Sequence, residues 1–215
     1  MKMPEGLDFD WWALKLTAMC VAVFALSQVF PQLYGTLILV GSEAASRPWT
    51  IVTHMFMHAD LPHLYFNMFA LAVFGSMFEK KAGSRTFLLV FFLGGLASTA
   101  ADIIFYPSTL GASGAIFAVL GCLALFRPKT VVWAMGVPMY VIAAFFIWGA
   151  IDLAGMFNPD RVAHASHLAG MGYGALYALW LRKKYPESRK ASPKEDDDGL
   201  PTREELDEWE KEWMR

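Results

Sequence analysis

A serine and five histidines are the residues of this sequence whose types and spacing could do chemistry. Ser113 lies in the string Gly111-Ala112-Ser113-Gly114, at the head of an apolar run that continues to Phe126. Serine and histidine together suit nucleophilic catalysis, in which an imidazole takes the proton of the attacking hydroxyl. Alone, a serine in a membrane helix more often bonds a carbonyl one turn earlier or packs against a neighbour. The histidines all fall just before or at the heads of two other apolar segments: His54, His58, His63, His164 and His167.

Composition indicates that the elements carrying these residues lie in a membrane. Of the 215 residues, 56% are hydrophobic and 18% are charged, and the mean hydropathy is +0.37. Soluble domains carry about a quarter charged residues. Cys20 and Cys122 each stand alone in an apolar run, which argues against a disulfide framework or a CxxC site and predicts two buried, small hydrophobic residues.

Apolar segments of helical length predict an all-α membrane bundle. About 20 apolar residues cross a hydrocarbon core of about 30 Å. The first segment lacks the features of a secretory signal, so we expect it to be a retained helix. The connection from 31 to 62 is too rich in aromatic and aliphatic residues for a solvated loop and is expected to be partly embedded. We predict six transmembrane helices: Trp11–Phe30, His63–Phe78, Thr86–Phe105, Ala112–Phe126, Val131–Leu153 and Ala163–Leu181.

Charge orients these helices with both termini in the cytoplasm, because basic residues collect on that side of a membrane protein. In this orientation only Arg47 and Arg161 of the membrane body lie outside. We therefore predict a multi-pass protein of the cell membrane whose candidate site opens toward the outer face. Ten basic residues then lie at the inner ends: Lys2, Lys15, Lys80, Lys81, Arg85, Arg127, Lys129, Arg182, Lys183 and Lys184.

An acidic tail follows the membrane body. Residues 1–185 hold 12 Lys and Arg against 9 Asp and Glu, whereas residues 186–215 hold 6 against 11. We expect three parts: a short N-terminus (1–10), a six-helix domain (11–185) and a cytoplasmic tail (186–215). Thr202 and Glu205 fit a capping box at the start of a short helix in the tail. The negative charge of the tail argues against binding nucleic acid or anionic lipid, and its partner is unknown.

Topology brings the candidate residues to one depth. The even-numbered spans run from outside to inside, so His63, Ser113 and His167, which lie at or near the heads of three of them, converge near the outer face. The fifteen residues of the fourth span rise about 22 Å, less than the thickness of the hydrocarbon core. Ser113 should therefore lie below the outer interface, in a water-filled recess lined by protein.

Helical spacing adds two side chains to this group. Asn67 follows His63 by four residues, so both project from the same face of the second span. Phe117 follows Ser113 by four residues and can cover whatever approaches the serine. Asn67 alone also fits an ordinary hydrogen bond between helices.

Small residues allow the fourth and sixth spans to approach closely. Gly170 and Gly174 follow His167 by three and seven residues, on its own helix face, and Gly114 follows Ser113 directly. Glycines at this spacing are also common in ordinary helix packing. Together with the serine and the histidine, they favour a hydrogen bond between the two side chains across the two helices.

Four motifs follow one another in the sequence: Arg47-Pro48-Trp49, the stretch His58-Ala59-Asp60-Leu61-Pro62-His63-Leu64-Tyr65-Phe66-Asn67, Gly111-Ala112-Ser113-Gly114, and His167-Leu168-Ala169-Gly170 with Gly174. In this order they resemble the motifs of the rhomboid family of intramembrane serine proteases, over residues 45–181. The resemblance implies six helices, a membrane-embedded first loop, and a Ser–His dyad without a third, acidic member. It also implies a structural role for Glu79 at the inner end of the second span. Phe117 departs from the family, which frequently has tyrosine there; it keeps the ring and loses the hydroxyl.

The resulting hypothesis is hydrolysis of peptide bonds in transmembrane protein substrates within the lipid bilayer. Ser113 is the expected nucleophile and His167 the general base. The backbone N–H of Ser113, the Asn67 amide and His63 are expected to hold the oxyanion.

The remaining polar residues of this region are left out of the hypothesis. Asp102 and Asp152 close the third and fifth spans at the outer side and are not assigned to the site. His164 is expected to be an exposed histidine at the rim. His54 and His58 are expected to brace the first loop.

Two alternatives remain open. The five histidines could ligate a metal ion, although no HExxH motif is present and no carboxylate-rich path crosses the membrane segments. A non-catalytic relative that binds membrane clients is the second alternative, but such relatives generally lack the serine or the histidine, and both are present. We expect no metal and no other cofactor.

Overall fold

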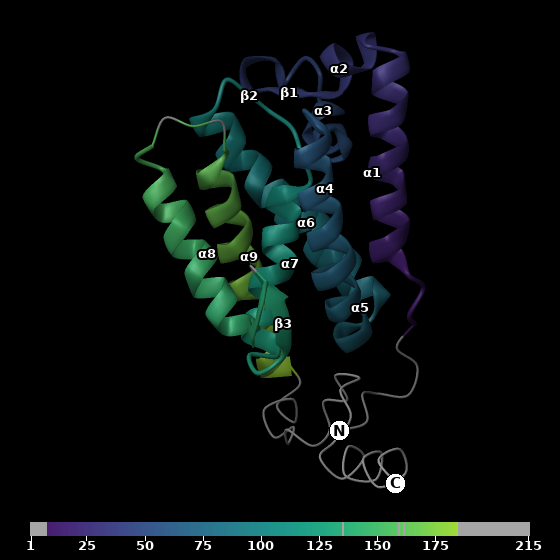
Figure 1. The fold of residues 1–215 in the computed structure, drawn as a ribbon. Helices are drawn as coiled ribbons and strands as arrows, with labels where there is room; N and C mark the ends of the chain where they lie inside the picture. The colour runs from purple at the N-terminus through teal and green to yellow at the C-terminus, as the bar shows by residue number, and fades with distance from the viewer. Residues whose placement is uncertain (1–7, 135, 159, 161, 185–215) are drawn as a thin grey trace, which may run out of the picture.

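The computed structural model describes residues 8–134, 136–158, 160 and 162–184 (Figure 1). Its helices confirm an all-α membrane bundle. The helical elements of the bundle are α1 (Trp12–Val29), α4 (Leu61–Ala70), η3 (Leu71–Gly75), α5 (Ser76–Ala82), α6 (Ser84–Phe105), α7 (Ser113–Phe126), α8 (Val141–Gly155) and α9 (His164–Lys184). The elements of the connections between them are α2 (Gln32–Leu37), β1 (Leu39–Val40), η1 (Gly41–Glu43), α3 (Thr50–Thr53), η2 (His54–Phe56), β2 (Ser108–Thr109), β3 (Val131–Ala134) and β4 (Val137–Tyr140).

Helix α7 is the centre of the bundle, with α9, α6 and α8 packed against it and α4 on its other side (Figure 1). Nearly every residue of α7 is buried, and many of them are small. Close packing of small residues is what holds helices together where no water is present to drive burial. Among the described helices, the candidate serine therefore begins one that is almost fully enclosed.

Three of the described helical segments have the length and composition to cross a membrane: α1, the continuous stretch from α4 to α5, and α6. The apolar helices α7 and α8 are shorter. At 1.5 Å per residue, the 14 residues of α7 rise about 21 Å. This length agrees with the expectation of a helix that is too short to reach both surfaces.

Apolar side chains also cover the outside of the bundle. Val29, Phe66, Ile104, Phe146 and Leu176 are each more than 60% exposed. A surface this apolar suits contact with lipid chains and is costly in water. The structure and the composition therefore agree on a multi-pass membrane protein.

The prediction of one long helix over Val131–Leu153 is wrong at its start. The strands β3 (Val131–Ala134) and β4 (Val137–Tyr140) form an antiparallel hairpin, in which Val131 pairs with Tyr140 and Trp133 with Pro138. Helix α8 begins only at Val141. Gly136 has φ +78°, which suits a tight turn. The β-branched residues before this turn favour a strand, and Pro138 disfavours a helix interior.

The first loop is an ordered layer of short elements. Between α1 and α4 it forms α2, β1, η1, α3 and η2, and β1 pairs with β2, with Leu39 opposite Thr109. This pair ties the loop to the segment that leads into α7. In Figure 1 the first loop covers the end of the bundle at which α7 begins.

The capping box expected at Thr202 and Glu205 of the tail lies outside the described residues.

Glu79 fastens α1 to the rest of the bundle. Its carboxylate is 1% exposed and accepts hydrogen bonds from the backbone N–H groups of Trp12 and Ala13, both at 2.9 Å. The Ser84 hydroxyl also donates to it at 2.6 Å. A carboxylate at a helix N-terminus satisfies free N–H groups and complements the helix dipole. This geometry supports the structural role that the resemblance implied.

Candidate active site

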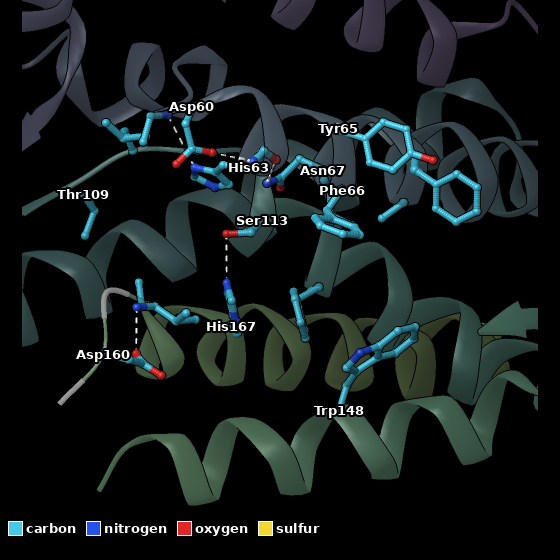
Figure 2. A pocket seen from close by; sticks show the side chains of 18 of the residues that line it. Asp60, His63, Tyr65, Phe66, Asn67, Thr109, Ser113, Trp148, Asp160 and His167 are labelled. Atoms are coloured by element: carbon cyan, nitrogen blue, oxygen red, sulfur yellow. Dashed lines mark hydrogen bonds between the residues drawn. The ribbon is translucent and has the colours of Figure 1, made fainter. Parts of the chain in front are cut away.

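Ser113 and His167 meet where α7 and α9 begin. The Ser113 Oγ and His167 Nε2 atoms are 2.9 Å apart, across 54 residues of sequence (Figure 2). Gly111 precedes the serine with φ +121°, a conformation that favours glycine, and its N–H donates to the His54 carbonyl at 2.9 Å. This turn sets the first residue of α7 opposite the histidine.

Glycines bring the two helices together at this point. A Cβ atom on Gly170 would collide with the carbonyl oxygen of Gly114, and one on Gly174 would collide with the carbonyl of Ala118. No larger residue fits without moving the backbone of α7. The close approach expected from the spacing is present, and it is what allows a short serine side chain to reach the imidazole.

Phe117 packs on the face of the histidine. Its ring is stacked on the His167 imidazole, with centroids 4.2 Å apart and planes only 5° from parallel. The position one turn after Ser113 places it there. The phenylalanine thus supplies an aromatic ring at this position without the hydroxyl of the tyrosine that the family frequently has.

His63 and Asn67 face the serine from α4. Both line the same cavity as Ser113 and His167 (Figure 2). The His63 ring lies against Gly111, where a Cβ atom would be 2.8 Å from His63 Nε2. Asn67 is 7% exposed, and its Nδ2 donates to the His63 carbonyl at 2.9 Å. The amide nitrogen carries a second N–H, which is available to a substrate oxygen while this bond is kept.

Asp152, which the sequence analysis left out, contacts the histidine. Its Oδ1 lies 2.9 Å from His167 Nδ1 and 2.7 Å from His164 Nδ1. The other ring nitrogen of His164 is 3.1 Å from Asp160 Oδ2. His164 is 7% exposed, so the expectation of an exposed rim histidine is wrong. The sequence held one indication of this contact, because Asp152 lies at the outer end of its predicted span and therefore at the same depth as Ser113.

His54 and His58 are buried residues that contact neighbouring helices. The Nε2 of His54 lies 3.0 Å from the Thr99 hydroxyl of α6. The His58 ring packs edge-to-face on His63, with centroids 5.1 Å apart. Burial lowers the pKa of each from 6.5 to about 4, because a desolvated imidazole resists protonation. Both are therefore neutral at physiological pH.

Of the described residues, Asp152, His164 and His167 form the group that could hold a metal ion, with ligand atoms within 4.8 Å of one another. Both Nδ1 atoms, however, sit at ordinary hydrogen-bond distance from one carboxylate oxygen. Hydrogen bonds alone account for the arrangement.

A cavity of about 1170 Å³ lies beside these residues. Its walls come from α4, which contributes Phe66 and Phe69, and from α8, which contributes Trp148 (Figure 2). Trp133 of β3 also lines it. Polar groups gather at the end of the cavity near Ser113, and aromatic side chains line the rest. The site can therefore hold an apolar segment with a polar reacting group at one end.

Comparison with known proteins identifies the class of protein. The Rhomboid domain model matches residues 45–184. The chain is 33% identical to rhomboid protease GluP of Bacillus subtilis over 69% of its length, and 29% identical to mitochondrial rhomboid protein 1 of Saccharomyces cerevisiae over 79%. It is 26% identical to rhomboid protease GlpG of Serratia proteamaculans over 78%. This chain belongs to the rhomboid family. It spans 30%, 53% and 61% of the lengths of these three relatives.

Proposed function

We propose that this chain is an intramembrane serine endopeptidase. The observation that carries the proposal is the 2.9 Å contact between Ser113 Oγ and His167 Nε2, made between two membrane helices beside a large cavity. Relatives of this chain bear the name rhomboid protease, which agrees with hydrolysis at such a site. Acyl transfer by a serine requires a general base within hydrogen-bond distance of its hydroxyl.

The reaction proceeds through an acyl-enzyme. Ser113 Oγ attacks the carbonyl carbon of the scissile peptide, its proton passes to His167 Nε2, and the carbonyl π electrons move onto the oxygen. When the C–N bond breaks, His167 returns the proton to the leaving amine. Water then attacks the ester by the same route, releasing the acid and restoring the Ser113 hydroxyl.

The oxyanion is held by three donors. The backbone N–H of Ser113 lies at the start of α7, where N–H groups have no acceptor within the helix. The Asn67 amide and the His63 ring approach from α4 on the other side of the cavity. Loss of one such donor typically costs about 3 kcal/mol of barrier lowering.

The substrates are transmembrane segments of other membrane proteins. The aromatic walls between α4 and α8 suit an apolar chain, and the polar end at Ser113 suits a peptide freed from helical hydrogen bonding. A helical peptide hides its carbonyl in the backbone ladder, so small or helix-breaking residues near the cleavage point favour reaction.

In the bilayer, we place both termini in the cytoplasm and the site toward the outer face. Six spans within residues 11–185 and a cytoplasmic acidic tail complete this arrangement. Basic residues at the ends of α5 and α9 support the orientation. The tail is proposed to take no part in nucleic-acid binding, and its partner is unknown.

The test is cleavage of a model single-span substrate in liposomes by the purified chain. Wild type should release two products, and Ser113→Ala and His167→Ala should release none. Ser27→Ala is the matched control, since this serine of α1 only bonds its own helix, at 2.7 Å to the Phe24 carbonyl. Cleavage that persists in Ser113→Ala would refute the assignment, and an inactive wild type with intact fold would favour a non-catalytic client-binding protein.

A further inference from the structure

We propose that Asp152 is a positioning residue for His167. This inference deepens the proposed function and rests on it. The family resemblance implies a pair of residues with no acidic member, whereas here a buried carboxylate contacts the base from behind. The relevant group, called the Asp152 network below, consists of Asp152, His164, Asp160 and His167.

The contact with Asp152 determines which nitrogen of the neutral imidazole carries the proton. An ionised carboxylate only accepts hydrogen bonds, so a 2.9 Å contact with Asp152 Oδ1 requires the proton of neutral His167 to be on Nδ1. The Nε2 lone pair then faces the Ser113 hydroxyl at 2.9 Å. This is the tautomer that a general base needs, and the opposite tautomer would present an N–H to the serine. Asp152 thus selects the reactive form of the ring.

The contact with Asp152 also fixes the geometry of the imidazole. Phe117 lies flat against the imidazole, which restricts tilting of the ring. It does not restrict rotation in the plane of the ring, because a stacked face offers no directional hydrogen bond. The contact between Asp152 and Nδ1 fixes that remaining freedom and aims Nε2 at Ser113.

Asp152 itself is supported by His164. The carboxylate is 4% exposed, and burying a charge is costly unless it is paired and hydrogen-bonded. His164 supplies a second donor at 2.7 Å, and its other nitrogen faces Asp160 at 3.1 Å, so the ring lies between two carboxylates as an imidazolium would. The charge of Asp152 is therefore compensated within the described chain.

The end of α8 is shaped to admit this network. Gly155 lies one turn after Asp152, and a Cβ atom there would collide with the ring of His164. A side chain at this position would push His164 away from the carboxylate. The Asp152 network therefore depends on two helix ends. Helix α8 contributes Asp152 and, one turn later, Gly155 as its last residue, and α9 contributes His164 and His167, which lie one turn apart.

The main experiment measures kcat and KM for cleavage of a model transmembrane substrate by Asp152→Asn. We expect kcat to fall by about 100-fold, since the amide can donate to Nδ1 and favour the wrong tautomer, as replacing the orienting aspartate does in serine protease triads. KM should change by less than about threefold, because the amide keeps the shape of the site. A decrease in kcat of less than about tenfold overturns the inference.

The matched control is Asp102→Asn, which neutralises another buried carboxylate, 3% exposed, at the end of α6. In the described chain Asp102 makes no hydrogen bond with His167, so kcat should stay within about threefold of wild type. A fall in Asp102→Asn equal to that in Asp152→Asn would mean that any buried carboxylate of this region is needed for the fold, and it would overturn the inference.

A spectroscopic measurement distinguishes a role of Asp152 in orienting His167 from a role in packing alone. In protein labelled with ¹⁵N-histidine, the His167 signals, assigned by their loss in His167→Gln, should report a proton on Nδ1 in wild type and a shift toward the other tautomer in Asp152→Asn. An unchanged tautomer in the variant overturns the inference even if activity is lost.

Variants of His164 keep the inference testable if Asp152→Asn does not fold. His164→Asn retains a donor at the place of Nδ1, whereas His164→Leu removes it. The inference expects a larger kcat for the asparagine variant, and equal values overturn it. Wild type and Ser113→Ala are assayed together with all variants: an inactive wild type refutes the proposed function, whereas active wild type with an active Asp152→Asn refutes only this inference.

Discussion

Phe117 and Asp152 hold the imidazole of His167 from two directions, its face and its edge. Phe117 lines the cavity beside Ser113, whereas Asp152 lies behind the imidazole and is not among the residues that line the cavity. The stacked ring, with centroids at 4.2 Å, uses an aromatic face where the family frequently has tyrosine. The orientation of His167 therefore depends on the packing of one ring and on one hydrogen bond.

The stacking leads to a prediction about Phe117. Phe117→Ala removes the ring and should lower kcat by about tenfold, since aromatic pairs contribute about 1 kcal/mol beyond their buried area. Phe117→Tyr keeps the ring and should stay within about threefold of wild type. Steady-state cleavage of the model substrate measures both. An equal decrease in kcat in the two variants would show that stacking of the ring on His167 does not determine the rate.

Burial of His58 predicts a loss of stability in acid. Its pKa is lowered to about 4 in the folded chain and is near 6.5 when unfolded, so the unfolded chain binds more protons between these values. The free energy of unfolding should therefore be largest above pH 6.5 and fall by about 3 kcal/mol as the pH drops to 4. Unfolding in detergent at several pH values measures the decline. His58→Gln, which does not titrate, should decline less steeply, and an identical slope would refute the explanation.

The nucleophile and the base were easier to predict from the sequence than the carboxylate that contacts the base. Ser113 and His167 could be paired from topology, because two helix heads on one side of a membrane must lie at one depth. Asp152 could not be assigned in the same way. Its placement depends on how closely the end of α8 approaches α9, where Gly155 leaves room for the ring of His164. Sequence spacing does not reveal this approach.

At the scale of elements, the approach of α7 and α9 decides whether the site exists. Their contact is backbone on backbone at Gly170 and Gly174, which only glycine permits. Such contacts tolerate little change, because interiors are closely packed and extra atoms force the backbone to move.

Two glycines of α9 test this point directly. Gly174→Ala would place a Cβ against the Ala118 carbonyl and should lower the free energy of unfolding by about 2 kcal/mol or more. Gly172→Ala meets nothing within 4 Å and should stabilise the helix by about 0.5 to 1 kcal/mol. Chemical unfolding in detergent compares the two. Similar effects from both would show that the close approach is not required.

Most of the helices could be predicted from apolar length, whereas the hairpin of β3 and β4 could not. Residues 131–153 form one apolar run, and apolarity alone does not distinguish a strand from a helix. The turn at Gly136 and the pairing of Trp133 with Pro138 decide the outcome locally. The hairpin leaves α8 shorter than predicted, with Asp152 one turn from its end.

At the scale of the whole molecule, the proposed orientation places opposite ends of the bundle in different compartments. Ser42 of η1, which directly follows β1, and Lys129, which shortly precedes β3, are both exposed. Figure 1 shows β1 and β3 at opposite ends of the bundle. Single cysteines there, with Cys20 and Cys122 left buried, should react differently with a membrane-impermeant maleimide applied to intact cells. Ser42→Cys should be labelled and Lys129→Cys should not. The reverse pattern would invert the proposed topology.

The proposed reaction depends on Ser113 being a nucleophile activated by His167. The most direct measurement is labelling of the purified chain with a serine-directed fluorophosphonate, followed by mass spectrometry to locate the adduct. We expect one adduct, on Ser113, which is lost in Ser113→Ala and strongly reduced in His167→Ala, while Ser27→Ala is labelled like wild type. An adduct on another serine, or undiminished labelling in His167→Ala, would contradict it.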